Sequence, residues 1–209
     1  MRWELSDGAE LELLENFIAP ADQARMFDEI AAAVPWQTRS IHIAGRIIPE
    51  PRQTAWIGDP DASYTYSGRL NVPTPWPPVL AALRERLCVQ LGAAFNSVLC
   101  NLYEDGRHSM GLHADAEPEL GPNPLIASVS LGATRRFQLR HRTLRDDKLD
   151  LDLCSGSLLG HFAGAFAEAA GNTATVPANS GCVAACAPPG FWNSGRNQRT
   201  CPAFSSAAR

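Results

Sequence analysis

The stretch from Asn96 to Glu117 reads N-S-V-L-C-N-L-Y-E-D-G-R-H-S-M-G-L-H-A-D-A-E, and the rest of the chain is best understood from it. Its first half alternates with the period of two typical of a strand, and a turn is predicted at Glu104-Asp105-Gly106. His113 and Asp115 then stand two residues apart, so on an extended chain their side chains share one side. An imidazole nitrogen and a carboxylate oxygen on one face supply two corners of the 2-His-1-carboxylate site that holds Fe(II). We therefore predict a metal site at His113 and Asp115.

Further motifs stand in a fixed order around this pair. Asn101 and Tyr103 form an N-x-Y pair ahead of it, and Glu117-Pro118 follow it. The other motif residues are Pro51, Arg52, Trp56, Gly58, Tyr64, Tyr66 and Ser67 upstream, and Ser128, Ser130, Gly132 and Phe137 downstream. In this combination and order, the chain resembles the AlkB family of Fe(II)- and 2-oxoglutarate-dependent dioxygenases, which remove alkyl groups from nucleic-acid bases. The resemblance covers about residues 10–159.

The resemblance also implies a role for each motif residue, without a catalytic residue beyond the metal site. Fe(II) would bind His113 and Asp115, 2-oxoglutarate would bind Asn101 and Tyr103, O2 would be the third reactant, and the target base would lie against Tyr64, Tyr66, Trp56 and Glu117. Aromatic side chains stack on a base with about 1–3 kcal/mol per base. Without the resemblance, the same aromatic residues are better interpreted as core residues of strands.

The order of elements predicts an α+β fold that is mostly β. Two amphipathic helices are expected, one that begins at about Pro20 and ends before Pro35 and one from Leu80 to Leu91, ahead of many short strands separated by turns. Leu125–Leu131 and Leu149–Leu153 are two of these strands. Such a series favours a sandwich or jelly roll. The resemblance implies the double-stranded β-helix, a jelly roll buttressed by the N-terminal helices, with an incomplete or aberrant C-terminal part.

A β-hairpin is predicted from Ser40 to Arg46, because alternating residues lead into Gly45. In relatives that act on nucleic acid, a hairpin at this position probes the duplex and can insert a bulky side chain into the gap left by a flipped base. The tip here is Ala44. An alanine is a poor wedge against an unstacking cost of a few kcal/mol. This departure favours single strands or small substrates over duplex DNA.

Composition limits the partners and the compartment. The 209 residues are 45% hydrophobic and 19% charged, which fits one globular domain and an expected monomer. A formal charge of −4 argues against broad phosphate binding by net charge. The basic run from Arg135 to Arg145 is either a local nucleic-acid patch or a solvated hairpin face. No apolar run reaches the ~20 residues that span a bilayer, and the six cysteines lack framework spacing, so we expect a cytoplasmic protein.

The composition changes abruptly at residue 160. Residues 160–209 contain no Leu, Ile, Met, Lys, Asp or Tyr, and they show no strand pattern. By resemblance, a second metal histidine belongs about fifteen residues after Gly156, where Gly171 stands, followed by R-x-N-x-T-x-R, which residues 196–200 echo only loosely. His161 comes too early and is interpreted as structural or exposed. We divide the chain into an incomplete dioxygenase-like domain, 1–159, and an atypical tail, 160–209, from a shifted reading frame or from divergence or disorder.

The predicted function is Fe(II)- and 2-oxoglutarate-dependent oxidative dealkylation of alkylated bases in DNA or RNA, as in DNA repair, with single strands preferred as partners. Because an imidazole ligand and the 2-oxoglutarate arginines are missing, we expect the chain as written to be inactive or nearly so. Even the loss of outer partners of a metal site costs roughly 10–100-fold. Two alternatives stay open: a 2-oxoglutarate dioxygenase that acts on protein or small molecules, and a catalytically dead binding module on the same fold.

Overall fold

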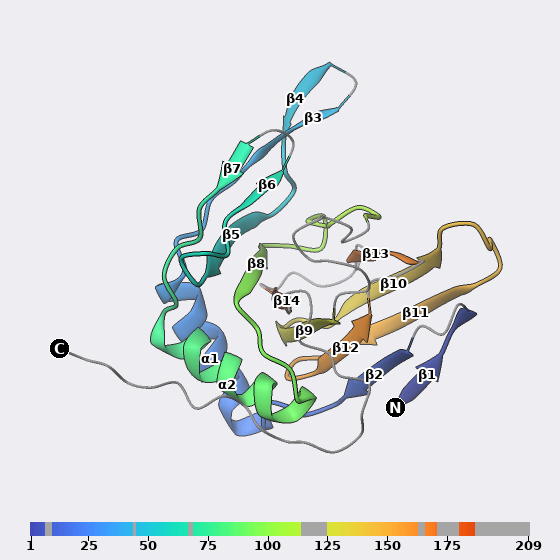
Figure 1. The fold of residues 1–209 in the computed structure, drawn as a ribbon, viewed down its shortest axis with the longest axis horizontal. Coiled ribbons are helices and arrows are strands. Elements are labelled where there is room, and N and C mark those ends of the chain that lie inside the picture. The colour runs from blue at the N-terminus through green and yellow to red at the C-terminus, as the bar shows by residue number, and fades with distance from the viewer. Residues whose placement is uncertain are drawn as a thin grey trace.

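The computed structural model describes residues 1–6, 10–43, 45–66, 69–113, 125–162, 166–170 and 180–186. For residues 41–43, 64–66 and 69–71, and for the strand residues from 162 on, it describes the backbone alone. The elements follow one another as β1 (Arg2–Glu4), β2 (Glu10–Leu14), α1 (Pro20–Ala33), β3 (Ser40–Ile43), β4 (Arg46–Pro49), β5 (Gln53–Gly58), β6 (Tyr64–Tyr66), β7 (Arg69–Asn71), α2 (Pro78–Leu91), β8 (Ser97–Tyr103), β9 (Leu125–Gly132), β10 (Arg135–His141), β11 (Lys148–Leu153), β12 (Leu158–Phe162), β13 (Phe166–Ala170) and β14 (Ser180–Cys186) (Figure 1).

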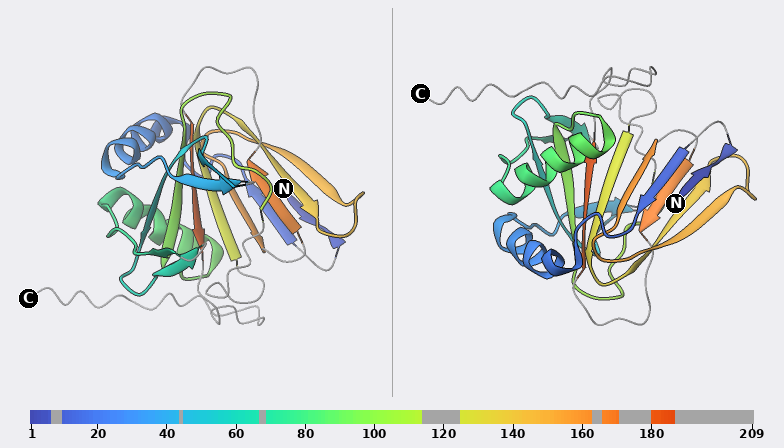
Figure 2. Two further views of the ribbon diagram at one scale, coloured as in Figure 1. Left: turned by 90° about the horizontal axis from the view of Figure 1, so that it is seen from above. Right: turned by 90° about the horizontal axis from the view of Figure 1, so that it is seen from below.

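Two antiparallel sheets carry the fold. The larger has the strand order β1-β2-β12-β9-β14-β8-β5, and the smaller has the order β11-β10-β13. They pack face to face (Figure 2) through apolar side chains of β2, β10, β11 and β12. These side chains are Leu11, Leu13, Phe137, Leu139, Leu151, Leu153 and Leu159. Two packed antiparallel sheets of short strands confirm the predicted mostly β jelly roll.

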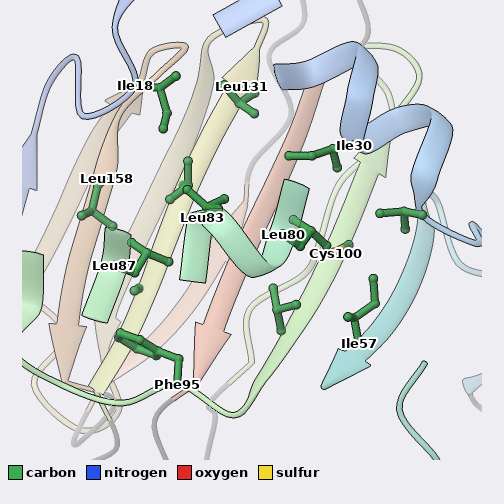
Figure 3. Close-up of a cluster of buried hydrophobic side chains, with 14 of the residues drawn as sticks. Ile18, Ile30, Ile57, Leu80, Leu83, Leu87, Phe95, Cys100, Leu131 and Leu158 are labelled. Atoms are coloured by element: carbon green, nitrogen blue, oxygen red, sulfur yellow. The ribbon is translucent and has the colours of Figure 1, made fainter. Parts of the chain in front are cut away.

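Both predicted helices are present, and they cover the outer face of the larger sheet (Figure 2). α1 begins at Pro20, where the missing N–H costs nothing, and carries Asp22 in its first turn. α2 ends at Gly92, whose φ of 65° is the left-handed conformation that stops a helix. The buried residues Leu80, Leu83 and Leu87 of α2 lie against the sheet (Figure 3). Within the described part of the chain, neither helix has the length and apolar composition needed to cross a bilayer.

The predicted hairpin is present as β3 and β4, which pair from Ser40–Pro49 to Ile43–Arg46. β6 and β7 form a second small hairpin. In Figure 1 both hairpins extend away from the β5 side of the larger sheet. Ala44, at the tip of the first hairpin, lies outside the described residues.

The expectation that no strand follows residue 159 is wrong. β12 continues to Phe162, β13 pairs with β10, and β14 lies between β8 and β9 with all seven of its residues paired on both sides. The physical reason is that the backbones of β8 and β9 need partners for their N–H and C=O groups, and any residue except proline can supply both. β14 is built from Ser, Gly, Cys, Val and Ala, mostly weak strand formers, so composition gave no sign of it. That residues 160–209 have a different origin from residues 1–159, through a shifted reading frame or divergence, stays a prediction.

Candidate active site

Strand β8 separates an apolar face from a polar one. Val98 and Cys100 are 1% and 0% exposed and belong to the core under the helices. Asn101 and Tyr103 alternate with them, so their side chains face the opposite way, into the space between the two sheets. They are 4% and 1% exposed. A buried amide and a buried phenol need hydrogen-bond partners, and these partners define the site.

A polar row crosses the larger sheet at the level of Asn101. The register pairs Asn101 with Thr54 of β5 and with Cys182 of β14, and Cys182 in turn with Ser130 of β9. Thr54 and Ser130 are 2% and 7% exposed. Paired residues of an antiparallel sheet share a face, so the interior of the jelly roll is polar here although it is apolar around Phe137 and Leu139. Such a row suits a polar ligand.

Arg52 fixes the orientation of the Asn101 amide. Its Nε donates to Asn101 Oδ1 at 2.9 Å, and its Nη2 lies 3.4 Å from Glu50 Oε2. The side chains of Arg52 and Glu50 are each 11% exposed. Because an N–H donor requires an oxygen, Oδ1 of Asn101 is taken and its NH2 group is left to donate in another direction. An oriented amide donor on the polar face fits the predicted contact of Asn101 with a 2-oxoglutarate carboxylate.

The segment after β8 is shaped by two arginines. Arg107 donates to Asp105 Oδ2 from Nε and Nη2 at 3.0 and 2.6 Å, and from its backbone N to Oδ1 at 2.8 Å. These hydrogen bonds lower the pKa of the Asp105 carboxyl from 3.8 to about 2. Arg135, from β10, donates to the backbone carbonyls of Asp105 and His108 at 2.6 and 2.8 Å. Its Cζ lies 4.2 Å from the centre of the Tyr103 ring, in a cation–π contact.

His113 is half-buried, and its Nδ1 lies 3.1 Å from the Gly111 carbonyl oxygen. A carbonyl can only accept, so this hydrogen bond requires a proton on Nδ1, and Nε2 is then the ring nitrogen suited to act as a metal ligand. Metal-bound histidines are commonly held in this way, by a backbone carbonyl on the other nitrogen. His113 therefore fits its predicted role. Asp115 and Glu117 lie outside the described residues, so their roles stay predictions.

Of the predicted base-contacting residues, Trp56 alone has a described side chain. It is half-buried on β5, where its Nε1 donates to the Ala62 carbonyl at 3.0 Å, which fixes the plane of the indole. Tyr64 and Tyr66 both lie on β6, whose hairpin with β7 stands near the β3–β4 hairpin (Figure 1). Their side chains are not described, so the aromatic clamp stays a prediction.

The second metal histidine has no counterpart among the described side chains. His161 is 2% exposed, with its ring 5.9 Å from that of Phe137, so the structural interpretation is confirmed and the exposed one is wrong. His161 pairs with Ile126, near the start of β9. Tyr103 is level with Gly132, at the opposite end of that strand, so His161 lies far from the predicted metal site. No group of three or more His, Cys, Asp or Glu that could hold a metal occurs in the described part of the chain. Gly171 and residues 196–200 lie outside it.

The basic run on β10 is split by the alternation of the strand. Arg135 and His141 are buried at 7% and 8% exposure, while Arg136 is exposed. Arg140 lies 2.7 Å from Asp150 and lowers the pKa of that carboxyl. Arg135 and His141 therefore cannot belong to an exposed basic patch, and a patch formed by the exposed Arg136, Arg142 and Arg145 stays a prediction beside the solvated hairpin face. Arg135 and Phe137 are two residues apart on one strand, so this alternation could have predicted that Arg135 is buried on the same face as Phe137.

Comparison with known proteins gives a consistent result. The family model described as the 2OG-Fe(II) oxygenase superfamily matches residues 10–163. The chain is 38% identical over 139 residues to the alpha-ketoglutarate-dependent dioxygenase alkB homolog 3 of Bos taurus, an alignment that covers 66% of this chain and 48% of that protein. It is 39% identical over 149 residues to the DNA oxidative demethylase ALKBH2 of Mus musculus, covering 66% and 62%. The alignments thus span less than two thirds of the length of these relatives.

Solved structures show the same fold. The structure of OsALKBH1 aligns with a TM-score of 0.61 at 16% identity, covering 88% of this chain and 99% of that one. A prolyl hydroxylase from Trichoplax adhaerens aligns with a TM-score of 0.58 at 10% identity, covering 85% and 83%. These alignments extend past residue 163, where the family model ends, so the fold is shared beyond the residues that the family model matches.

Proposed function

The chain belongs to the 2OG-Fe(II) oxygenase superfamily and within it to the AlkB family, and from this premise we propose that its function is the oxidative dealkylation of alkylated bases in nucleic acid. The observation that carries the proposal is the buried pair Asn101 and Tyr103, whose strand leads directly to His113. Arg52 holds the amide of this pair as a donor. The proposed substrate is single-stranded DNA or RNA, met by a monomer in the cytoplasm.

The roles of the residues follow from their atoms. The NH2 group of Asn101 and the hydroxyl of Tyr103 would donate to 2-oxoglutarate, and their burial keeps water from competing. His113 would hold Fe(II) through Nε2, with Asp115 as its carboxylate partner. Bound iron and 2-oxoglutarate would supply the activation of O2 and the hydroxylation of the alkyl carbon. Trp56, Tyr64, Tyr66 and Glu117 would orient the base.

The activity of this chain is expected to be weak or absent. The described side chains fit a 2-oxoglutarate carboxylate, but His113 is the single described candidate ligand for the iron. Two histidines come after it in the sequence: His141 lies at the opposite end of β10 from Arg135, and His161 lies at the far end of β9. Removing outer partners of a metal site already costs roughly 10–100-fold in affinity or activity, and the loss of a direct ligand costs more. The β14 position level with Asn101 is a cysteine, which offers a carboxylate no positive charge.

Succinate formation tests the proposal. The purified chain is incubated with Fe(II), ascorbate, 2-oxoglutarate and a methylated single-stranded oligonucleotide, beside the unmethylated oligonucleotide and free metabolites. We expect slow succinate formation that the methylated strand stimulates and that His113→Ala abolishes. Stimulation by a metabolite or a protein instead would favour the second kind of dioxygenase. Turnover that is insensitive to His113→Ala would refute the site.

A catalytically dead binding module is the second candidate, and the missing imidazole favours it. The two functions differ in metal dependence, because a ligand that binds the folded state stabilises it by an amount that grows with the ratio of ligand concentration to Kd. If Mn(II) with 2-oxoglutarate leaves the melting temperature unchanged while the methylated oligonucleotide still binds, the module is dead. A rise in melting temperature that His113→Ala removes supports the enzyme.

A further inference from the structure

The segment Glu104–Leu112 connects Tyr103 to His113, and so it sets the distance between the co-substrate pair and the metal histidine. It forms turns without a helix or strand of its own. Much of it is solvent-exposed, with Leu112 at 59%. A backbone of this kind samples many conformations unless other parts of the molecule hold it.

Arg135 holds this segment at two backbone carbonyls and also contacts Tyr103, the last residue of β8. Its Nη2 and Nη1 donate to the carbonyls of Asp105 and His108 at 2.6 and 2.8 Å, and its guanidinium lies over the ring of Tyr103 at 4.2 Å. Arg135 is the first residue of β10 and is 7% exposed. Another tie is Ser109 N, which donates to the Pro51 carbonyl at 3.1 Å. One rigid side chain thus joins the smaller sheet to the end of β8 and to both halves of the turn.

We propose that Arg135 is a positioning residue that keeps the Tyr103 hydroxyl and the His113 imidazole in one geometry. The inference rests on the proposed function and deepens it. An arginine suits this place better than a lysine, because its planar fork can serve two carbonyls while its face stacks on an aromatic ring. If Arg135 served folding alone, an apolar side chain of similar volume would do as well or better, since burying a cation is costly.

The test compares Arg135→Met and Arg135→Lys with Arg140→Met as the matched control. Arg140 lies on the same strand, but its partner is Asp150, away from the segment. The first readout is amide hydrogen exchange of residues 104–112, which needs neither metal nor substrate. We expect exchange to be about tenfold faster in Arg135→Met, intermediate in Arg135→Lys and unchanged in the control, with β5 and β8 unchanged throughout.

The second readout is the affinity for Mn(II) in the presence of 2-oxoglutarate, which a purely structural role would leave at the value of the control. We expect a fall of roughly 10–100-fold in Arg135→Met and partial recovery in Arg135→Lys. Unchanged exchange in residues 104–112 overturns the proposal. The proposal is also overturned if exchange in Arg135→Met is faster but its Mn(II) affinity equals that of the control. Arg135 would then hold the segment without affecting the metal site.

Two further outcomes are decided by the same measurements. If Arg135→Met does not fold, both measurements are made on Arg135→Lys, which keeps the charge, and are judged by the same criteria. If the unsubstituted chain binds no Mn(II), the proposed function fails, and hydrogen exchange alone decides whether Arg135 holds the segment. Faster exchange of residues 104–112 in Arg135→Met than in Arg140→Met supports the proposal, and equal exchange overturns it.

Discussion

Strands β8 and β14 lie side by side in the larger sheet and are paired over seven residues, yet β8 alone of the two carries residues predicted to bind the co-substrate. β8 brings Asn101 and Tyr103 to the polar face, and each has fixed contacts with an arginine. β14 reads S-G-C-V-A-A-C and contains no charged residue. The two strands share one ladder of backbone hydrogen bonds. The comparison teaches that a sheet accepts almost any backbone as a strand, whereas a site requires particular side chains.

The same contrast explains how the chain can keep the family fold even if its site is incomplete, as the sequence predicts. Structural alignments cover 85% or more of the chain, and the family model stops at residue 163. Backbone pairing depends on shape and on hydrogen-bonding groups that every residue except proline has. A metal ligand or a carboxylate-binding arginine has no such substitute. A change of sequence past residue 160 can therefore leave the architecture and remove the activity.

The largest effect is expected from removing β14 together with β13. Deleting residues 163–209 would leave β8 and β9 without their shared partner and β10 without β13. Exposed strand edges in the middle of a sheet promote aggregation, so we expect no cooperative unfolding transition and little soluble protein. Deleting residues 187–209 alone keeps every strand in the described part of the chain. Urea unfolding of this shorter deletion should match that of the full chain, and equal behaviour of both deletions would contradict the role of β14.

The next largest effect is expected in Mn(II) affinity, and it distinguishes His113, the predicted metal ligand, from His161. His113→Ala should lower the Mn(II) affinity, measured by calorimetry, by more than the roughly 100-fold upper range for outer partners of a metal. His161→Leu should leave that affinity unchanged, because His161 lies at the far end of β9, among apolar side chains. A fall in affinity with His161→Leu would show that the tail contributes chemistry as well as backbone.

Much of this architecture could be predicted from the sequence. β8, β9 and β11 follow from alternation, and α1 and α2 follow from helical spacing. The metal role that a two-residue spacing gives to His113 and Asp115 stays a prediction, because Asp115 lies outside the described residues. The strands β13 and β14 could not be predicted, because Ala and Gly carry little strand preference and the reason for their pairing lies in β8, β9 and β10. The contacts of Arg52 with Asn101 and of Arg135 with Asp105 join residues 49 and 30 positions apart. No local pattern encodes such distances.

A third prediction concerns the polar row that β8 shares with its neighbours. Asn101→Ala removes a donor to a charged co-substrate, a hydrogen bond of about 1.5–3 kcal/mol, so 2-oxoglutarate affinity should fall roughly tenfold to a hundredfold. Thr54→Val on the paired position of β5 is the control. Thr54 Oγ1 is buried with no hydrogen-bond partner among the described atoms, so replacing it by a methyl should be neutral or stabilising. Calorimetric titration with 2-oxoglutarate checks the first effect, and urea unfolding checks the second.

If both substitutions weaken 2-oxoglutarate binding equally, the row acts through packing and Asn101 loses its special role. The stability of Asn101→Ala has to be measured as well, because Arg52 Nε then loses the oxygen to which it donates. That loss should cost about 1–3 kcal/mol. Binding should fall by more than this destabilisation explains if Asn101 contacts the co-substrate directly.

The smallest effect is expected in the turn that follows β8, where the order of the segment depends on pH. Folding lowers the pKa of Asp105 from 3.8 to about 2, chiefly through the side chain of Arg107. The stabilisation is therefore fully present above about pH 4 and disappears as the pH falls through about 2. It is small because the pair is exposed and screened by salt. The carboxyl resonance of Asp105 should titrate near 2 and return towards 3.8 in Arg107→Met. If it titrates near 3.8 in both proteins, Arg107 does not order the turn, and the positions of Tyr103 and His113 depend on Arg135 and on the Ser109 tie.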